Sequence, residues 1–400
     1  MLVSVVASLA ASELLLRWSV PHLPLRFHKY LHGEVFVLAQ RSKRSLLPHE
    51  YIALFGDSYA QGAGDWYEAA VGDDWGEGAP YQAAHVLFET TGRDVISFGA
   101  SGASSFDGLV FFPLRLTAKL AARGIELEPP AQIVAYFYEG NDLNDNLDLL
   151  RRHWPRLARS VAGSTEVTDD LGEMIAFLEA LTERHRWRLE QPLRLRDRLY
   201  LSRFAAVLYG DLRRMARHLV GGEETEAVPP TPVHLGGARL HLPEPLESPA
   251  LELTGAELER ALLVFHAALT LTARNFAPIP ILLVYLPSPL AVYRLAAERV
   301  PTETTNGTHR VYASAAIDRR SDRIGAAVAA IAAAVGVDFL DARPVLRAIA
   351  RDRPVHGPGD WGHLNRTGYE ALGRAIAGAL EKERGDGRCR PRAPVATAAR

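Results

Sequence analysis

The sequence predicts an α/β protein built around a buried parallel β-sheet. Five short apolar runs, rich in β-branched or aromatic residues and bounded by Gly, Pro or Asp, alternate with stretches of helical pattern. Near-continuous apolar strands indicate a sheet that helices cover on both faces, because a strand with one wet face alternates polar and apolar side chains. The five runs are residues 51–55, 94–98, 133–138, 279–286 and 337–340.

The helices before the fourth and fifth strands have clear termini in the sequence. Thr254 and Glu257 form a capping box that predicts a helix start. The Ala-rich helix before the fifth strand is expected to end at Gly336, a typical C′ glycine. The first of these helices carries an apolar stripe at helical spacing, through Leu258, Leu262, Phe265 and Leu269.

Too much chain separates strands three and four for a single crossover. Residues 145–255 are therefore predicted to be an insertion, helical and Arg-rich up to about residue 220 and then a Gly-, Pro- and Glu-rich loop. The arginines indicate either a solvated helical face or a lid or surface that faces anionic partners or membrane. They are Arg184, Arg186, Arg188, Arg194, Arg196, Arg198, Arg203, Arg213, Arg214 and Arg217.

The two ends of the chain lie outside the predicted domain of residues 49–382. Residues 383–400 are predicted to be a disordered tail, and residues 1–48 an apolar segment that carries Glu13 and Arg17 in its first run. A spanning helix needs roughly 20 mainly apolar residues, so a marginal membrane anchor, an interfacial helix and a buried helix compete. A membrane-associated or cell-envelope location is favoured over a soluble cytoplasmic one, although the basic residues that follow fit a cytoplasmic side.

Composition excludes several classes of function. The 400 residues carry 45 Lys and Arg against 47 Asp and Glu, a formal net charge of −2, which argues against nucleic acid as a partner. The one cysteine, Cys389, excludes an internal disulfide framework and a cysteine-based metal site. Neither a metal-ligand pattern nor a phosphate-binding loop stands out, so no metal and no cofactor are predicted.

Four short polar motifs follow the predicted strands. Residues 56–58 (GDS), 97–102 (SFGASG) and 139–142 (EGND) follow strands one to three, and residues 360–365 (DWGHLN) lie beyond strand five. Each has an ordinary explanation by itself, because Ser58 can cap a helix and the others fit turns. The carboxyl ends of parallel strands share one edge of a doubly wound sheet, so we expect the four motifs to meet there.

Together the motifs supply the parts of a nucleophilic active site. Ser58 offers a hydroxyl and His363 a general base, and Asp360 lies three residues upstream, where its carboxylate can hydrogen-bond Nδ1 of the imidazole. The glycines of residues 97–102 leave amide groups free to stabilise an oxyanion, and Asn141 can aim its NH₂ group into the same crevice.

The last predicted helix follows this base directly. Asn365 is expected to cap it, and its apolar positions include Leu372 and Ile376. The nearest rival base is His356, which lies between a valine and Gly-Pro.

These motifs resemble the SGNH, or GDSL-type, hydrolase family. The blocks GDSYAQG, SFGASG, GND and DWGHLNRTG occur in the family's order, and the first and last are the most specific. The resemblance covers about residues 51–142 and 279–380, and neither the insertion nor the ends. It implies a three-layer αβα, flavodoxin-like fold with a five-stranded sheet in the order 2-1-3-4-5, and acyl-ester chemistry.

By position, the resemblance also implies which residues do the chemistry. The second block usually starts with Asn, whereas this chain has Ser97, which leaves Gly99 as the alternative to Gly102. The implied site comprises the nucleophile Ser58, the base His363, its partner Asp360 and three oxyanion donors, which are Gly102, Asn141 and the backbone N–H of Ser58.

Three functions compete on this evidence. The leading hypothesis is a serine hydrolase that cleaves an acyl or acetyl ester of a lipid or carbohydrate through an acyl-enzyme. The second is an O-acetyltransferase or deacetylase that acts on a cell-surface polysaccharide, suggested by the apolar N-terminus and the large insertion. The third is a catalytically silent binding module. The expected partner is a small-molecule or glycan ester in the first two cases.

Overall fold

A computed structural model describes residues 2–19, 38, 40–45, 47–64, 82–121, 125–161, 167–190, 199, 201–202, 205, 209, 230–243, 245–303 and 309–385. At its centre lies a parallel five-stranded sheet with the strand order β11-β7-β3-β1-β2, which confirms the predicted order. The strands are β1 (Ile52–Phe55), β2 (Val95–Ser97), β3 (Gln132–Tyr138), β7 (Ile281–Leu286) and β11 (Asp338–Asp341).

The five strands fall where the apolar runs predict them. Every residue of β1, β3 and β7 is buried, as expected for central strands that are covered on both faces. The edge strand β11 is only half-buried. The apolar runs therefore mark burial in the sheet and locate the strands to within two residues at each end.

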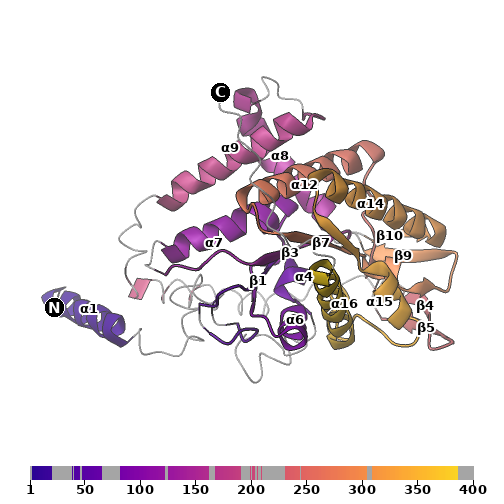
Figure 1. Cartoon of the computed structure of the whole chain (residues 1–400), viewed down its shortest axis with the longest axis horizontal. Coiled ribbons are helices and arrows are strands. Elements are labelled where there is room, and N and C mark those ends of the chain that lie inside the picture. The colour runs from indigo at the N-terminus through magenta and orange to yellow at the C-terminus, as the bar shows by residue number, and fades with distance from the viewer. Residues whose placement is uncertain are drawn as a thin grey trace.

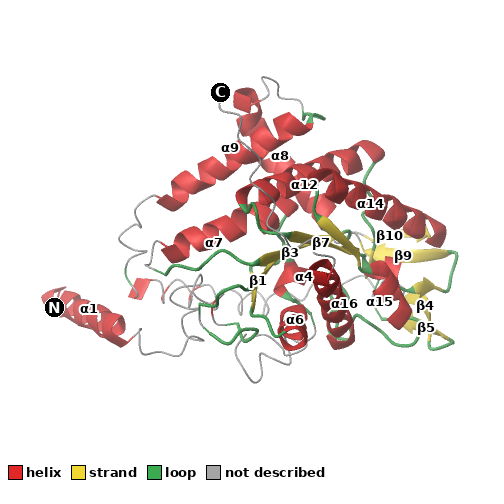
Figure 2. Ribbon diagram, in the orientation of Figure 1, coloured by secondary structure: helices red, strands yellow, loops and turns green. Residues whose placement is uncertain are grey.

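Helices cover both faces of the sheet (Figure 1). One face holds the π-helical turn η3 (Asp107–Phe111) and the helices α7 (Phe112–Ala121), α8 (Asp142–Val161), α9 (Leu171–Glu190), α12 (Gly255–Asn275) and α14 (Ser314–Val335). The other face holds α6 (Ala83–Thr91), α15 (Arg343–Ile349) and α16 (Arg366–Gly385). The result is a three-layer αβα arrangement, as the secondary-structure view also shows (Figure 2).

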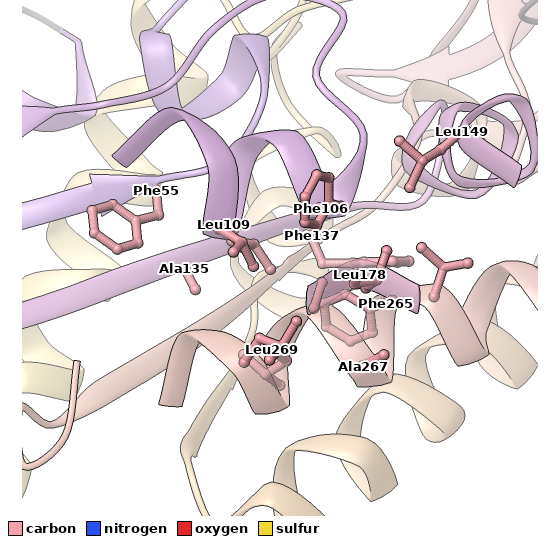
Figure 3. Close-up of a cluster of buried hydrophobic side chains, with 14 of the residues drawn as sticks. Phe55, Phe106, Leu109, Ala135, Phe137, Leu149, Leu178, Phe265, Ala267 and Leu269 are labelled. Carbon is pink, nitrogen blue, oxygen red and sulfur yellow. The ribbon is translucent and has the colours of Figure 1, made fainter. Parts of the chain in front are cut away.

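Two apolar cores separate these layers. On the first face, Phe137 of β3 and Phe265 of α12 pack with their ring centroids 4.5 Å apart. Figure 3 shows this cluster, in which Phe106 and Leu178 approach the sheet from other elements. Burial of such side chains contributes roughly 1.5–3 kcal/mol each. The first core therefore ties α9, which lies within the predicted insertion, to the sheet.

Three predicted helix ends are present in the structure. Thr254 and Glu257 form the capping box that begins α12. Gly336 follows α14 in the left-handed conformation, with φ 78°. The side chain of Asn365 accepts a hydrogen bond from the backbone N–H of Gly368, and so caps α16.

Two small sheets contain strands of the predicted insertion. One sheet has the order β5-β4-β8, with β4 (Thr231–Leu235), β5 (Ala238–Leu242) and β8 (Arg294–Leu295). The other has the order β10-β9-β6, with β6 (Leu246–Glu247), β9 (Arg299–Glu303) and β10 (His309–Ala313). The described elements also include the short helices α4 (Ser58–Gln61) and α13 (Pro289–Val292).

The prediction of a loop across residues 221–245 is wrong for its second half. β4 and β5 form a hairpin there, and its turn is Gly236-Gly237, with φ of 57° and 79°. Positive φ at both central residues suits a two-residue turn between twisted strands, and glycine adopts it without strain. Residues 221–229 lie outside the described part of the chain, as do most of the predicted arginines.

The N-terminal segment contains the helix α1 (Leu2–Ser19). Six of its large apolar side chains are at least half exposed, which does not fit a buried helix; they are Val5, Val6, Leu9, Leu14, Leu15 and Trp18. Across the described residues, no helix combines the length and apolar character needed to cross a membrane. The predicted tail beyond residue 385, with Cys389, is outside the described residues.

Candidate active site

The turn after β1 places Ser58 at the carboxyl edge of the sheet. Gly56 has φ +149°, and a Cβ there would lie 2.9 Å from Cβ of Tyr136, so the turn requires glycine. Asp57 then caps α4, because its carboxylate accepts a hydrogen bond from the backbone N–H of Tyr59 at 2.9 Å. Ser58 is the first residue of that helix. The alternative in which the Ser58 hydroxyl is the cap is therefore wrong. The hydroxyl makes only a long contact of 3.5 Å with Oδ2 of Asp57, so it can bond a closer partner.

That partner is His363, which the sequence places 305 residues away. The Ser58 hydroxyl donates to Nε2 of His363 at 2.8 Å, and Nδ1 of His363 donates to Oδ2 of Asp360 at 2.7 Å. The other oxygen of Asp360 accepts hydrogen bonds from the backbone N–H groups of Gly362 and His363. The structure thus brings together three of the predicted site residues in one hydrogen-bonded chain, with the spacing that nucleophilic catalysis needs.

The charges around His363 raise the pKa of its imidazole above the value of a histidine in water. Burial lowers the pKa of His363, but the hydrogen bond and charge of Asp360 and the charges of Asp57 and Glu247 outweigh it, so that the pKa lies above 6.5. Burial raises the pKa of Asp360, yet its bonds to His363 and to its own loop hold it below the usual value. Asp360 is therefore a carboxylate that stabilises a protonated imidazole.

Two tyrosines fix the loop that carries His363 against the turn that carries Ser58. The Tyr59 hydroxyl donates to the carbonyl of Gly362 at 2.7 Å, and the Tyr59 ring lies 5.2 Å from the imidazole. The Tyr369 hydroxyl of α16 donates to the carbonyl of Ala63 at 2.6 Å. Each contact spans about 300 residues of sequence. The first joins the Ser58 turn to the His363 loop directly, and the second joins the start of α16 to the segment just after α4.

The second motif offers one backbone N–H that is still available. The N–H of Gly99 donates to the Ser97 hydroxyl, that of Ala100 to the Gly56 carbonyl, and that of Ser101 to the Gln61 amide. For the Gly102 N–H, by contrast, the described residues supply no acceptor. Among the two predicted alternatives, Gly102 is thus the better candidate donor, and Gly99 has a packing role.

Asn141 has an amide that its own turn does not use. The turn after β3 is closed by Asp142, whose Oδ2 accepts from the backbone N–H of Tyr138 at 3.0 Å. Oδ1 of Asn141 is buried and meets no hydrogen-bond partner among the described residues. The ordinary explanation of this asparagine as turn chemistry therefore does not account for its side chain, which leaves the amide for a ligand.

The rival base His356 is excluded by its surroundings. Its side chain is buried, and Nδ1 lies 3.1 Å from the hydroxyl of Tyr293. Burial lowers the pKa of His356 to about 3, with the charge of His363 acting in the same direction. A fully buried, neutral imidazole whose hydrogen-bond partner is a tyrosine is part of the core and cannot act as the base for Ser58.

The structure adds acidic side chains that the sequence did not single out. Burial raises the pKa values of Asp57 and Asp142, and it raises that of Asp145 to about 7. Oε2 of Glu247 accepts a hydrogen bond from the hydroxyl of Tyr138 at 2.5 Å. The sequence pattern gives no indication of Glu247, because this residue lies in a two-residue strand of the predicted insertion. No group of three metal-ligating side chains occurs in the described ranges.

Comparison with known proteins gives structural neighbours only. No protein-family model and no curated protein matches the sequence. The neighbours include a lipase/acylhydrolase from Enterococcus faecalis, with 13% identity, a TM-score of 0.35, and coverage of 86% of this chain and 100% of that chain. A protein assigned to the G-D-S-L lipolytic family, from Desulfitobacterium hafniense DCB-2, has 12% identity and a TM-score of 0.32, and covers 83% and 100%.

A third neighbour is an acetyl xylan esterase, AlAXEase, with 12% identity, a TM-score of 0.30, and coverage of 82% of this chain and 99% of that chain. These solved structures include proteins of the family that the four sequence blocks resemble. At such TM-scores the likenesses carry no weight of their own, and the chemistry proposed below rests on the geometry of the site.

Proposed function

We propose that this protein is a serine hydrolase that cleaves an ester through a Ser-His-Asp triad. The observation that carries the proposal is the unbroken hydrogen-bonded chain from Asp360 through His363 to Ser58, with distances of 2.7 and 2.8 Å. Three residues from two distant parts of the sequence meet in the order nucleophile, base and orienting acid. Chance packing has no reason to produce this order at the carboxyl edge of an α/β sheet, where ligands bind.

The geometry supports a two-step reaction. As the Ser58 oxygen attacks the ester carbonyl, its proton passes to Nε2 of His363, and Asp360 stabilises the imidazolium. The tetrahedral oxyanion is stabilised by the N–H of Ser58, the N–H of Gly102 and the amide of Asn141. His363 then returns the proton to the leaving alcohol, which leaves an acyl group on Ser58. Water attacks this ester with His363 as the base again, releasing the acid and restoring the hydroxyl.

The first test is the substitution Ser58→Ala with p-nitrophenyl acetate as the substrate. Removal of the nucleophile is expected to lower turnover by roughly 10⁴-fold or more, while the melting temperature stays close to that of the wild type. Ser314→Ala, which alters a serine at the start of α14, serves as the control and keeps its activity. Hydrolysis by Ser58→Ala at the wild-type rate would reject the assignment.

A fluorophosphonate probe separates the enzyme from a silent binding module with the same fold. An activated serine reacts with the probe, whereas an ordinary hydroxyl does not. Labelling is expected at Ser58 in the wild type and is expected to disappear in His363→Ala, which removes the base. Absence of any label on wild-type Ser58 would favour the binding module.

Acetyl transfer to or from a cell-surface polysaccharide is the second candidate. It uses the same triad, and the exposed apolar side chains of α1 favour a substrate at a surface or envelope. The two functions differ in the fate of the acyl group. Release of free acetate in the presence of a glycan acceptor supports hydrolysis, and formation of acetylated glycan supports transfer.

A further inference from the structure

Glu247 lies beside the proposed site although it comes from the insertion, outside the blocks that resemble known hydrolases. It is the last residue of β6, which pairs in parallel with β9. Its Oε2 accepts a hydrogen bond from the hydroxyl of Tyr138 at 2.5 Å. Tyr138 is the final residue of β3 and is 2% exposed. A buried phenol needs a partner for its O–H, and a carboxylate is a strong one.

From Tyr138 the contacts continue to the loop that holds the base. The ring of Tyr138 packs on the ring of Tyr59, with centroids 4.3 Å apart, and Tyr59 in turn lies 5.2 Å from the imidazole of His363. The Tyr59 hydroxyl donates to the carbonyl of Gly362 at 2.7 Å, one residue before His363. Glu247 is therefore connected to the base through two buried tyrosines, whose rings pack at a tilt of 39°, and one hydrogen bond to a backbone carbonyl.

Charge gives Glu247 a second connection to the base. The groups that face His363 are Asp360 of its own loop, Asp57 of the turn after β1, Glu247 of β6 and the neutral His356. Three carboxyl groups from three different elements thus act on the imidazole through their charge, and Asp360 is also hydrogen-bonded to it. Negative charge nearby favours the imidazolium that forms when Ser58 gives up its proton.

We infer that Glu247 is a positioning residue for the base His363, which it acts on through Tyr138 and Tyr59. The inference rests on the proposed function, because it concerns the base of that reaction. It gives the insertion a defined part in catalysis: β6 supplies a carboxylate that orients one tyrosine and adds to the negative field at the site. A purely structural Glu247 would affect stability and leave the titration of His363 unchanged.

Two variants separate the hydrogen bond from the charge. Glu247→Gln keeps an oxygen that can accept from Tyr138 but removes the charge, so the acid limb of kcat/KM for p-nitrophenyl acetate is expected to move about half a unit to lower pH. Tyr138→Phe keeps the ring but removes the hydroxyl, and kcat is expected to fall roughly 3- to 10-fold with little change in KM. Glu259→Gln removes an exposed carboxylate from α12 and is the matched control.

The outcomes are distinguishable. A Glu247→Gln enzyme whose acid limb and kcat both match those of the control would overturn the inference. Glu247→Gln alone therefore tests the role of Glu247, even if Tyr138→Phe does not fold. If Glu247→Gln and Tyr138→Phe act through the same contacts, the fall in kcat of the double variant is expected to be smaller than the two single effects combined. Ser58→Ala is measured in the same assay: if it stays active, the hydrolase and the role of Glu247 both fail, and if it is inactive, a null result for Glu247→Gln rejects that role alone.

Discussion

The two arms of the proposed site are held in different ways. The nucleophile arm, residues 56–61, is buried except for Gln61. Another backbone segment packs closely against it, because a Cβ on Gly99 would lie 2.3 Å from the backbone nitrogen of Gln61. The base arm, residues 360–365, is only partly buried, with the side chain of Asp360 34% exposed. Side-chain hydrogen bonds hold it, from Asp360 within the loop and from Tyr59 across to the other arm.

This difference separates stability from chemistry. Backbone packing around the nucleophile arm belongs to the core, so changes there are expected to destabilise the whole fold. Hydrogen bonds on the base arm lie at the rim, so changes there are expected to alter proton transfer and leave the fold intact. Asp57 of the nucleophile arm and Asp360 of the base arm both raise the pKa of His363, but only Asp360 is hydrogen-bonded to its imidazole.

The largest expected effect comes from Asp360→Asn on the base arm. The amide keeps the size of the side chain but removes the charge that stabilises the imidazolium and fixes its tautomer, so kcat is expected to fall by roughly 10³- to 10⁴-fold. The midpoint of thermal unfolding is expected to change little. Asp352→Asn, which alters an exposed aspartate just after α15, is the control for the charge change. A large drop in melting temperature would show that the base arm is part of the core after all.

The next effect comes from Gly99→Ala beside the nucleophile arm. The added methyl group would meet backbone atoms at 2.3–2.7 Å, and we expect unfolding to become easier by about 3 kcal/mol. Gly102→Ala is the matched control, because its Cβ meets no atom within 4 Å and only its φ of +68° opposes the change. That variant is expected to lose about 1 kcal/mol. Equal losses in urea unfolding would contradict backbone packing as the cause.

A smaller effect is expected from Asp145, which faces the carboxylate of Asp57. Burial raises the pKa of Asp145 to about 7 in the folded protein, against 3.8 when free. Between about pH 4 and pH 7, Asp145 therefore keeps its proton in the folded protein but loses it in the unfolded chain. The protein becomes less stable as the pH rises through this range.

Asp145→Asn removes the carboxyl group that titrates, so the variant is expected to keep its stability as the pH rises. At pH 8 the variant is expected to be more stable than the wild type by roughly 1–3 kcal/mol, and at pH 4 the two are expected to be equal. Asp318→Asn, which alters an exposed carboxylate of α14, is the control for the change of charge. Denaturant unfolding at both pH values provides the measurement, and an advantage that is equal at both would contradict titration of this carboxyl group.

The finest test concerns His363 itself. Its pKa lies above 6.5, and only the neutral imidazole accepts the serine proton, so kcat/KM is expected to fall as the pH drops through a midpoint higher than 6.5. In Asp57→Asn the midpoint should move lower, because one of the charges that raise this pKa is gone. A midpoint of the wild-type pH profile below 6.5 would show that burial, which lowers the pKa of His363, outweighs the nearby negative charges that raise it.

Much of the fold was predictable because burial leaves a local trace. A strand covered on both faces must be apolar along its length, and β3 and β7 are apolar almost throughout. The hairpin of β4 and β5 is not predictable from the apolar pattern, because β5 is exposed along most of its length and β4 contains Pro232, so the segment has the composition of a loop. Its signal was the pair Gly236-Gly237 between two extended segments.

The candidate site was predictable in part for a related reason. Ser58, Asp360 and His363 lie in short motifs at strand ends, and the topology of the sheet brings these ends together. The N-cap of α4 was not decidable, since Asp57 and Ser58 are both good caps and only the fold shows which one bonds. Glu247 could not be found either, because its contact with the site spans 109 residues and no local pattern predicts it.

The most direct measurement of the central claim is capture of the acyl-enzyme. The protein is mixed with p-nitrophenyl acetate, quenched in acid within the first turnovers, digested and analysed by mass spectrometry. If Ser58 is the nucleophile and His363 its base, the acetyl group is found on the peptide that contains Ser58, and it is absent from Ser58→Ala and from His363→Ala. Acetyl groups on other residues only, or equal acetylation of Ser58 in His363→Ala, would contradict the triad.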